Sequence, residues 1–77
     1  MTWKEKDNTL QKTFELNSFS EIIKHLQPLS KICDEAEHHP DFEVFDYKNI
    51  RFKLTTHDAG KVTQKDYDLA VEIDKLF

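Results

Sequence analysis

Apolar and polar residues alternate in the first part of the chain, which is typical of strands. In residues 9–16, Leu10, Phe14 and Leu16 fall on one face and Gln11, Thr13 and Glu15 on the other, the period of a half-buried strand. Residues 3–6 are long enough for a short earlier strand. Asp7 and Asn8 separate the two segments, and both residue types tolerate turn geometry. The sequence therefore predicts a β-hairpin at the start of the chain.

From Phe19 to about His38, apolar residues recur every three or four positions, as in a helix with one buried stripe. Ser18 and Glu21 have the spacing of a capping box, in which each side chain bonds to the other residue's backbone amide. Pro28 lies inside this segment, but the apolar stripe keeps its phase across it. We therefore predict one helix, kinked at the proline, with His38 in its last turn.

Two more strands are predicted at residues 42–47 and 50–57, joined by a two-residue turn at 48–49. After a loop, a second helix is expected from Thr63, with Asp66 as its capping partner. The order β-β-α-β-β-α predicts an α+β fold, a four-stranded antiparallel sheet with two long helices packed on one face. The core is expected to include the apolar residues of these last elements, namely Ile50, Phe52, Leu54, Leu69, Ala70, Ile73, Leu76 and Phe77.

Composition narrows the class of protein. Residues 1–77 are expected to form a single small domain, whose core alone contributes only a few kcal/mol, so a homo-oligomer is expected. One cysteine, no membrane-length apolar run and no signal peptide together favour a cytoplasmic protein with no membrane contact. A net charge of −4 and scattered lysines argue against direct nucleic acid binding. The single glycine excludes a glycine-rich phosphate loop.

The residues best suited to chemistry lie around His38, His39 and Pro40. Because Pro40 cannot extend a helix and biases the preceding residue away from one, the two adjacent imidazoles are expected to point in different directions. Asp34 lies four residues before His38, on the same face of the predicted helix. Asp34, Glu37 and the negative end of that helix would all favour a protonated His38. Imidazoles titrate near neutral pH, so such a cluster suits proton transfer.

Other interpretations compete with proton transfer. A histidine pair before a proline is more often an exposed helix end, His57 at a strand end is commonly a partly buried polar residue, and capping alone accounts for Asp66. A metal site would use the histidines with Cys33 or Asp34, but no HExxH or CxxC pattern is present. Cys33 lies on the apolar stripe, where a thiol has a raised pKa and stays unreactive.

The chemistry-bearing residues also follow a recognisable spacing: an acid, His-His-Pro, an aromatic residue, a histidine and an aspartate, at Asp34, His38-His39-Pro40, Tyr47, His57 and Asp66. This pattern resembles the signature of the pterin-4a-carbinolamine dehydratase family. The similarity covers nearly the whole chain and extends to Trp3 and Phe19. At Asp34 and Phe42 the family often has Glu and Trp, which keep the chemical type with a longer reach.

The resemblance implies an enzyme that dehydrates 4a-hydroxytetrahydropterin to quinonoid dihydropterin in tetrahydrobiopterin recycling, by proton transfers and with no cofactor. By resemblance, His38 and His57 would be acids near the leaving hydroxyl group, and His39 would bind the pterin and assist the base step. Residues that bind the substrate or support the histidines would be Asp34, Glu37, Pro40, Phe42, Thr56 and Asp66.

The resemblance also implies a quaternary structure and an alternative role. A homo-oligomer, a dimer or tetramer, is expected. Related proteins usually carry a helix ahead of the tryptophan strand that helps to assemble oligomers, whereas Trp3 lies close to the start of this sequence. Proteins of this fold also serve as dimerisation cofactors of a transcription factor, a coactivator role, or as assembly factors without catalysis. Retention of all three histidines favours the enzyme, because a scaffold does not need them.

Overall fold

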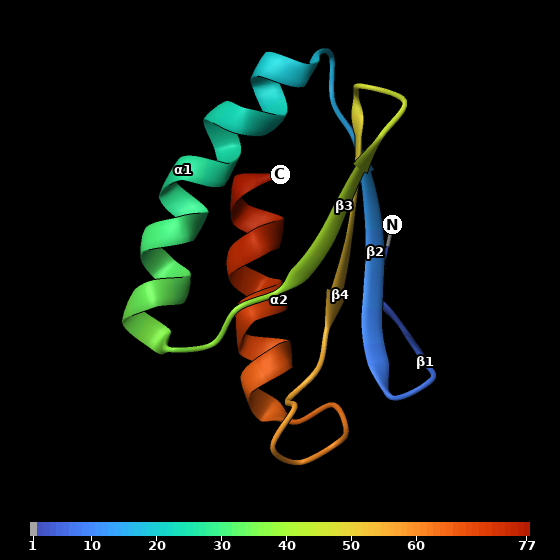
Figure 1. Cartoon of the computed structure of the whole chain (residues 1–77), viewed down its shortest axis with the longest axis vertical. Coiled ribbons are helices and arrows are strands. Elements are labelled where there is room, and N and C mark those ends of the chain that lie inside the picture. Colours follow the sequence, from blue (N-terminus) through green and yellow to red (C-terminus); the bar gives the residue numbers. More distant parts are fainter. Residues whose placement is uncertain (1) are drawn as a thin grey trace.

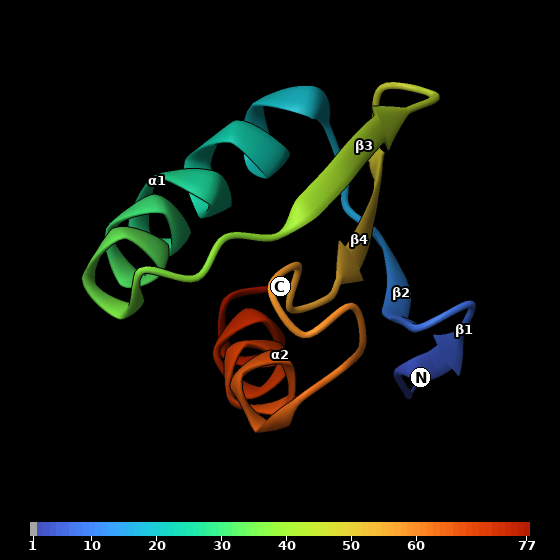
Figure 2. The ribbon, with the colours of Figure 1, turned by 60° about the horizontal axis from the view of Figure 1, so that its bottom comes forward.

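The structure is a computed structural model that describes residues 2–77. It has two layers, a four-stranded antiparallel sheet and two helices that both lie on one face of it (Figures 1 and 2). The predicted α+β class and element order are confirmed. In chain order the elements are β1 (Lys4–Lys6), β2 (Thr9–Glu15), α1 (Phe19–Ala36), β3 (Asp41–Phe45), β4 (Asn49–Leu54) and α2 (Gln64–Leu76).

The sheet has the strand order β1-β2-β4-β3, so β2 and β4 are the inner strands and β1 and β3 are the edges. Leu10 of β2 pairs with Leu54 of β4, and Phe42 of β3 pairs with Phe52 of β4. Because side chains alternate along a strand, this register turns the apolar residues toward the helices. The core that results consists of Leu10, Ile22, Leu29, Cys33, Ile50, Phe52, Leu54, Leu69, Ala70 and Ile73. Of the predicted core, Leu76 and Phe77 are only partly buried.

A polar cluster fastens the first hairpin to α2. The Trp3 indole N–H donates to Asp74 Oδ1 at 3.1 Å, and Lys12 Nζ lies 2.7 Å from the same oxygen. Lys12 also lies 4.7 Å from the centre of the Phe14 ring, within cation–π range. The cluster holds the edge strand and its neighbour against the second helix.

The two hairpins differ in their turns. Asp7 and Asn8 have φ values of 52° and 62°, as the predicted two-residue turn requires. In the second hairpin the prediction of a turn at 48–49 was wrong. Asn49 is already the first residue of β4, paired with Phe45, and residues 46–48 form the turn. The Lys48 carbonyl accepts the Leu16 N–H at 2.8 Å, which ties this turn to the end of β2.

Helix α1 runs through Pro28 without interruption, so the prediction of one helix is confirmed, and Ser18 Oγ accepts the Glu21 N–H at 3.2 Å. The prediction that His38 lies in its last turn was wrong. The helix ends at Ala36, and Glu37 takes a left-handed conformation with φ of 53°. The Glu37 and His38 amides then bond back to carbonyls of the last turn at 3.3 and 3.2 Å, the usual way to close a helix C-terminus.

Strand β4 also ends earlier than predicted, at Leu54, so His57 lies in a loop and not in a strand. The reason is a tight turn in which the Gly60 N–H bonds to the Thr56 and His57 carbonyls at 2.9 and 3.1 Å. Gly60 has a φ of 67°, a conformation that glycine adopts without strain. Within residues 2–77, neither helix is both long enough and apolar enough to cross a lipid bilayer.

Candidate active site

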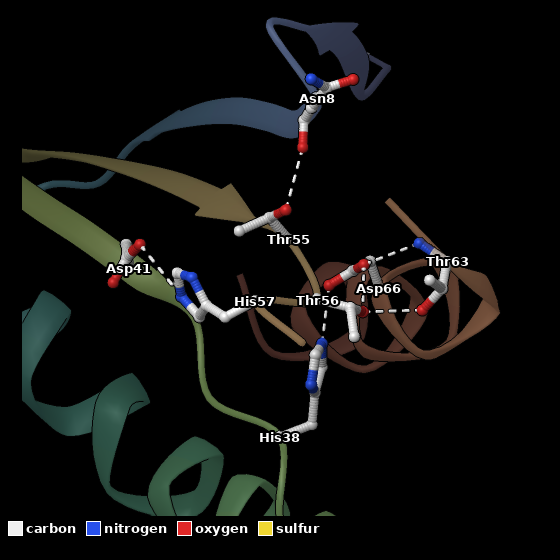
Figure 3. Close-up of polar contacts among 8 residues, drawn as sticks. All are labelled: Asn8, His38, Asp41, Thr55, Thr56, His57, Thr63 and Asp66. Atoms are coloured by element: carbon white, nitrogen blue, oxygen red, sulfur yellow. Dashed lines mark hydrogen bonds and ion pairs between the residues drawn. The ribbon is translucent and has the colours of Figure 1, made fainter. Parts of the chain in front are cut away.

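His38 and Asp66 are 28 residues apart in the sequence but meet at 2.6 Å, His38 Nε2 to Asp66 Oδ1 (Figure 3). His38 lies in the segment between α1 and β3, and Asp66 in the first turn of α2. The Asp66 side chain is fully buried, and that of His38 is 13% exposed. The structure therefore brings together two of the predicted site residues.

Both oxygens of the Asp66 carboxylate have fixed partners. Oδ1 faces His38, while Oδ2 accepts the Thr63 backbone N–H at 2.9 Å and the Thr56 hydroxyl at 2.8 Å (Figure 3). The bond from Thr63 N–H is the predicted helix-capping contact. The capping role and the histidine contact thus use different oxygens of one carboxylate, so Asp66 serves both.

Thr63 is a member of this network that sequence reasoning missed as a site residue. Its hydroxyl lies 2.7 Å from the Thr56 hydroxyl, which in turn donates to Asp66. Thr63 was recognised only as the start of a helix. The feature that could have identified Thr63 as a site residue is its capping partner Asp66. If that acid is buried, both of its oxygens need hydrogen-bond donors, and residues next to it in the fold must supply them.

The ionisation of Asp66 is governed by opposing effects. Burial of the carboxyl raises its pKa, but the bonds from the Thr63 N–H, His38 and Thr56 together outweigh burial and hold the pKa below its usual value. A carboxylate that accepts several hydrogen bonds is stabilised in its charged form. Asp66 is therefore a buried anion beside His38 at neutral pH.

The depressed pKa of Asp66 leads to a testable pH dependence. An acid whose pKa is lower in the folded than in the unfolded state stabilises the fold above its unfolded pKa, about 3.9, and loses this contribution as the pH falls through the folded value. We expect Asp66→Asn to lower the free energy of unfolding most at pH 5–7, with the difference from the unmodified protein shrinking below about pH 4. Urea denaturation followed by circular dichroism between pH 2 and 7 measures it.

Asp68→Asn is the matched control, because Asp68 is an exposed acid on the same helix, and its carboxylate accepts a hydrogen bond from the Gln64 side chain. Its effect should be small across the same range. Equal pH dependence in the two variants would contradict the role given to Asp66.

His39 pairs with Asp34, Nε2 to Oδ1 at 2.8 Å, and both side chains are mostly exposed. The sequence predicted that Asp34 would face His38 instead. That prediction was wrong because Glu37 leaves the helix, so His38 does not follow the helical spacing from Asp34. His38 turns toward α2, while His39 turns back to α1. As expected, the two adjacent imidazoles point in different directions.

Of the three histidines, His57 has the most exposed side chain and the longest distance to a carboxylate. Its side chain is 75% exposed, and its Nε2 lies 4.0 Å from Asp41 Oδ2 (Figure 3). Asp41, the first residue of β3, is another site residue that the sequence did not single out, although it directly follows Pro40. The Thr55 hydroxyl donates to the Asn8 carbonyl at 2.9 Å, which anchors the chain just before His57.

All three histidines line one hollow of about 340 Å³, within the usual size range of small-molecule sites. The predicted gathering of three histidines, distant along the chain, is thus present in the structure. Glu37 lines this hollow, but in residues 2–77 no hydrogen bond joins its carboxylate to an imidazole. The complete lining is Glu37, His38, His39, Pro40, Asp41, Thr55, Thr56, His57, Asp58 and Lys65.

Phe42 lines a second, smaller hollow beside the first. This cavity of about 210 Å³ lies between α1 and the start of β3 and shares His39 and Pro40 with the histidine hollow. Phe42 is 48% exposed there, with its ring centre 5.9 Å from that of Phe52. Phe42 therefore lines the neighbouring cavity and packs against Phe52 of the core.

The arrangement suits proton transfer. Each imidazole has one carboxylate neighbour, and the three acids range from fully buried to mostly exposed. Among residues 2–77, no three His, Cys, Asp or Glu side chains form a group that could hold a metal ion. Cys33 is buried in the core, where burial, and next the Asp34 charge, raise the pKa of its thiol.

Comparison with known proteins gives a consistent picture. A family model described as pterin 4 alpha carbinolamine dehydratase matches residues 1–76. A Picosynechococcus protein provisionally named a pterin-4-alpha-carbinolamine dehydratase is 43% identical over 74 residues, which are 96% of this chain and 79% of the relative. A Roseiflexus protein with the same provisional name is 40% identical, over 96% of this chain and 78% of its own length.

Two solved structures share the fold. A transcriptional coactivator/pterin dehydratase from Brucella melitensis superimposes with a TM-score of 0.89 and 21% identity, covering 96% of this chain and 80% of its own. A pterin dehydratase-like protein described as a RuBisCO assembly factor in the alpha-carboxysome gives a TM-score of 0.79 and 22% identity, covering 99% and 89%. At these identities the two structures establish likeness of fold.

Proposed function

The chain belongs to the pterin 4 alpha carbinolamine dehydratase family, and from this premise we propose that it dehydrates 4a-hydroxytetrahydropterin to quinonoid dihydropterin in tetrahydrobiopterin recycling. The observation that carries the proposal is the hollow lined by His38, His39 and His57. A carboxylate lies beside each of these imidazoles. Family membership supplies the reaction, and the hollow supplies groups that could carry it out.

The reaction is an elimination of water. The bond between C4a and the hydroxyl oxygen breaks, and the oxygen leaves as water after it receives a proton. N5 loses its proton as the C4a=N5 double bond forms. Nothing is oxidised or reduced, so the step requires one proton donor and one proton acceptor near the pterin ring.

His38 is the proposed proton donor. Its Nε2 is occupied by Asp66, which leaves Nδ1 as the nitrogen that can face the substrate. In the imidazolium form both ring nitrogens carry a proton, so Nδ1 can donate to the substrate while Nε2 bonds to Asp66. Thr56, Thr63 and Asp66 act as positioning residues, because they touch the imidazole or each other and not the reacting atoms.

His39 and His57 complete the proposed mechanism. His39, with Asp34 at 2.8 Å, binds the pterin and accepts the N5 proton. His57 is exposed and loosely paired with Asp41, so it can turn toward the leaving hydroxyl group as a second donor. Pro40 fixes the angle between the two adjacent histidines, and Phe42 forms the apolar wall beside them.

The test is a direct assay of dehydration. With 4a-hydroxytetrahydropterin generated in situ, the rate of water loss should exceed the buffer rate and rise in proportion to protein concentration. The absorbance change on formation of the quinonoid product gives the rate. A rate equal to that in buffer, from a protein with a native circular dichroism spectrum, would refute the dehydratase assignment.

A second candidate is a binding role, alone or alongside catalysis. The two structural neighbours are described as a coactivator and an assembly factor, and this chain exposes apolar side chains on its helices at Phe19, Ile23 and Val71. Such residues suit a protein partner in a coactivator role, or a second copy of the chain in a dimer or tetramer. Light scattering measures the mass of the protein in solution, and a mass equal to that of one chain would contradict the dimer or tetramer.

A further inference from the structure

The face of the sheet opposite the helices contains a hollow of about 460 Å³, larger than either cavity beside the histidines. Both helices lie on the other side of the sheet, so this face is uncovered (Figures 1 and 2). The hollow is lined by four cations and three neutral polar residues, with no carboxylate among them: Thr2, Lys4, Lys6, Gln11, Lys12, Thr13 and Arg51. The Lys12 ammonium is paired with Asp74 of α2 at 2.7 Å, which leaves Lys4, Lys6 and Arg51 as the cations that could face a ligand.

The strand register explains why these residues meet. Lys4 of β1 pairs with Gln11 of β2, and Thr13 of β2 pairs with Arg51 of β4. Paired residues share a face of a sheet, and residues two apart on a strand do so as well, which adds Lys6. Glu5, between the two lysines, points to the helix side, where its carboxylate accepts the Tyr67 hydroxyl of α2 at 3.0 Å.

The charge of this hollow stands out in a chain of net charge −4. Within residues 2–77, carboxylates form ion pairs with four lysine or arginine side chains, and neither Lys4 nor Lys6 is among them. The four are Lys12, Lys48, Arg51 and Lys75. Arg51 is held in place by Glu43 at 2.7 Å and by the Phe45 ring, 4.8 Å from its guanidinium carbon. Glu43 and Phe45 lie on β3, on the far side of Arg51 from the lysines, so the β1 side of this face carries the positive charge.

The spacing of the cations indicates the size of the anion. Cα atoms two residues apart on a strand are about 6.6 Å apart, and β1 is about 9.6 Å from β4 across two strand spacings. Lysine contributes a point charge and arginine a two-pronged donor to phosphate oxygens. A compact single ion spans only part of such a surface, whereas a chain of phosphates reaches all three cations. We propose that this hollow binds a polyphosphate chain, free or as the tail of a nucleotide.

The test is a titration of the 15N-labelled protein with inorganic tripolyphosphate at low salt. We expect amide shift changes at Lys4, Gln11, Thr13 and Arg51, and affinity that falls with rising salt. The double variant Lys4→Gln/Lys6→Gln should raise the Kd about tenfold or more. ATP titrated in parallel separates the two sources, because equal affinity assigns the phosphate chain alone and tighter binding of ATP assigns a nucleotide.

The matched control is Lys24→Gln/Lys31→Gln, which removes the same charge from exposed positions on α1. This control should bind tripolyphosphate nearly as well as the unmodified protein. Equal weakening in both double variants would show a response to net charge, and no saturable binding would refute the site outright. In either case Lys4 and Lys6 would retain only the role of protecting an edge strand from pairing. The readout is binding, so it is independent of dehydratase activity.

Discussion

Replacing His38 with Ala is expected to lower kcat/KM for 4a-hydroxytetrahydropterin dehydration by about 10²–10⁴-fold, the usual contribution of a positioned proton donor. The reason is that His38 has the most fully fixed imidazole of the three, with its Nε2 2.6 Å from the buried Asp66 carboxylate. Its side chain is 13% exposed, so solvent water is a poor replacement for it. Initial rates over a range of substrate concentrations measure the loss.

The control for this variant is His25→Ala. His25 lies on α1 and pairs with Glu21 at 3.6 Å, outside both cavities near the site. Its replacement should change kcat/KM less than about twofold, since surface substitutions away from a site have small effects. If His38→Ala retained the rate of the His25 control, proton donation would have to come from His39 or His57.

A further variant separates catalysis from positioning. Asp66→Asn keeps the shape of the side chain but removes the negative charge 2.6 Å from His38 Nε2. The pKa of Asp66 lies below its usual value, so the part of the acidic limb of the kcat/KM pH profile that follows protonation of Asp66 should disappear in Asp66→Asn. A merely structural role would lower the rate by the same factor at every pH.

The fold could be predicted from the sequence because its signals are local and agree with one another. The strand period near Leu10, the capping residues Ser18 and Thr63 and the helical stripe each indicate their element independently. The errors arose at element ends. Helix α1 stops at a left-handed Glu37, and no sequence rule places a glutamate there in preference to the following residues.

The members of the site could be named from the sequence, but their pairing could not. The family pattern singled out Asp34, His38 and Asp66, and the helical spacing then joined Asp34 to His38. In the structure one residue of left-handed backbone separates them, and Asp34 pairs with His39 instead. Contacts such as that of Thr63 with Thr56 depend on how a loop meets a helix, which local patterns do not encode.

The basic hollow on the open face of the sheet could not be predicted from the sequence, because its residues are dispersed along the chain. The lysines on β1 and Arg51 on β4 come from strands that are distant in sequence and are two strands apart in the sheet. Lysines that look scattered singly therefore form a cluster once the strand order is known. A search for runs of basic residues cannot find a site of this kind.

Replacing Phe52 with Ala is expected to lower the free energy of unfolding by about 3–5 kcal/mol. The smaller side chain buries less apolar surface on folding, and it also leaves a cavity in the core. Phe52 is completely buried on β4, and its ring centre lies 5.2–6.4 Å from those of Trp3, Phe14, Phe42 and Phe77. A chain of 77 residues has a total stability of roughly 4–12 kcal/mol, so a loss of this size removes a large part of it. Phe42, which packs on Phe52, lines the cavity that shares His39 and Pro40 with the histidine hollow, so dehydratase activity should fall with the folded fraction as temperature rises. Urea denaturation measures the free energy of unfolding.

The control is Phe19→Ala. Phe19 is 52% exposed, so its replacement should lower the free energy of unfolding by only about 0.5 kcal/mol. Equal losses in the two variants would mean that the aromatic cluster around Phe52 does not form the centre of the core.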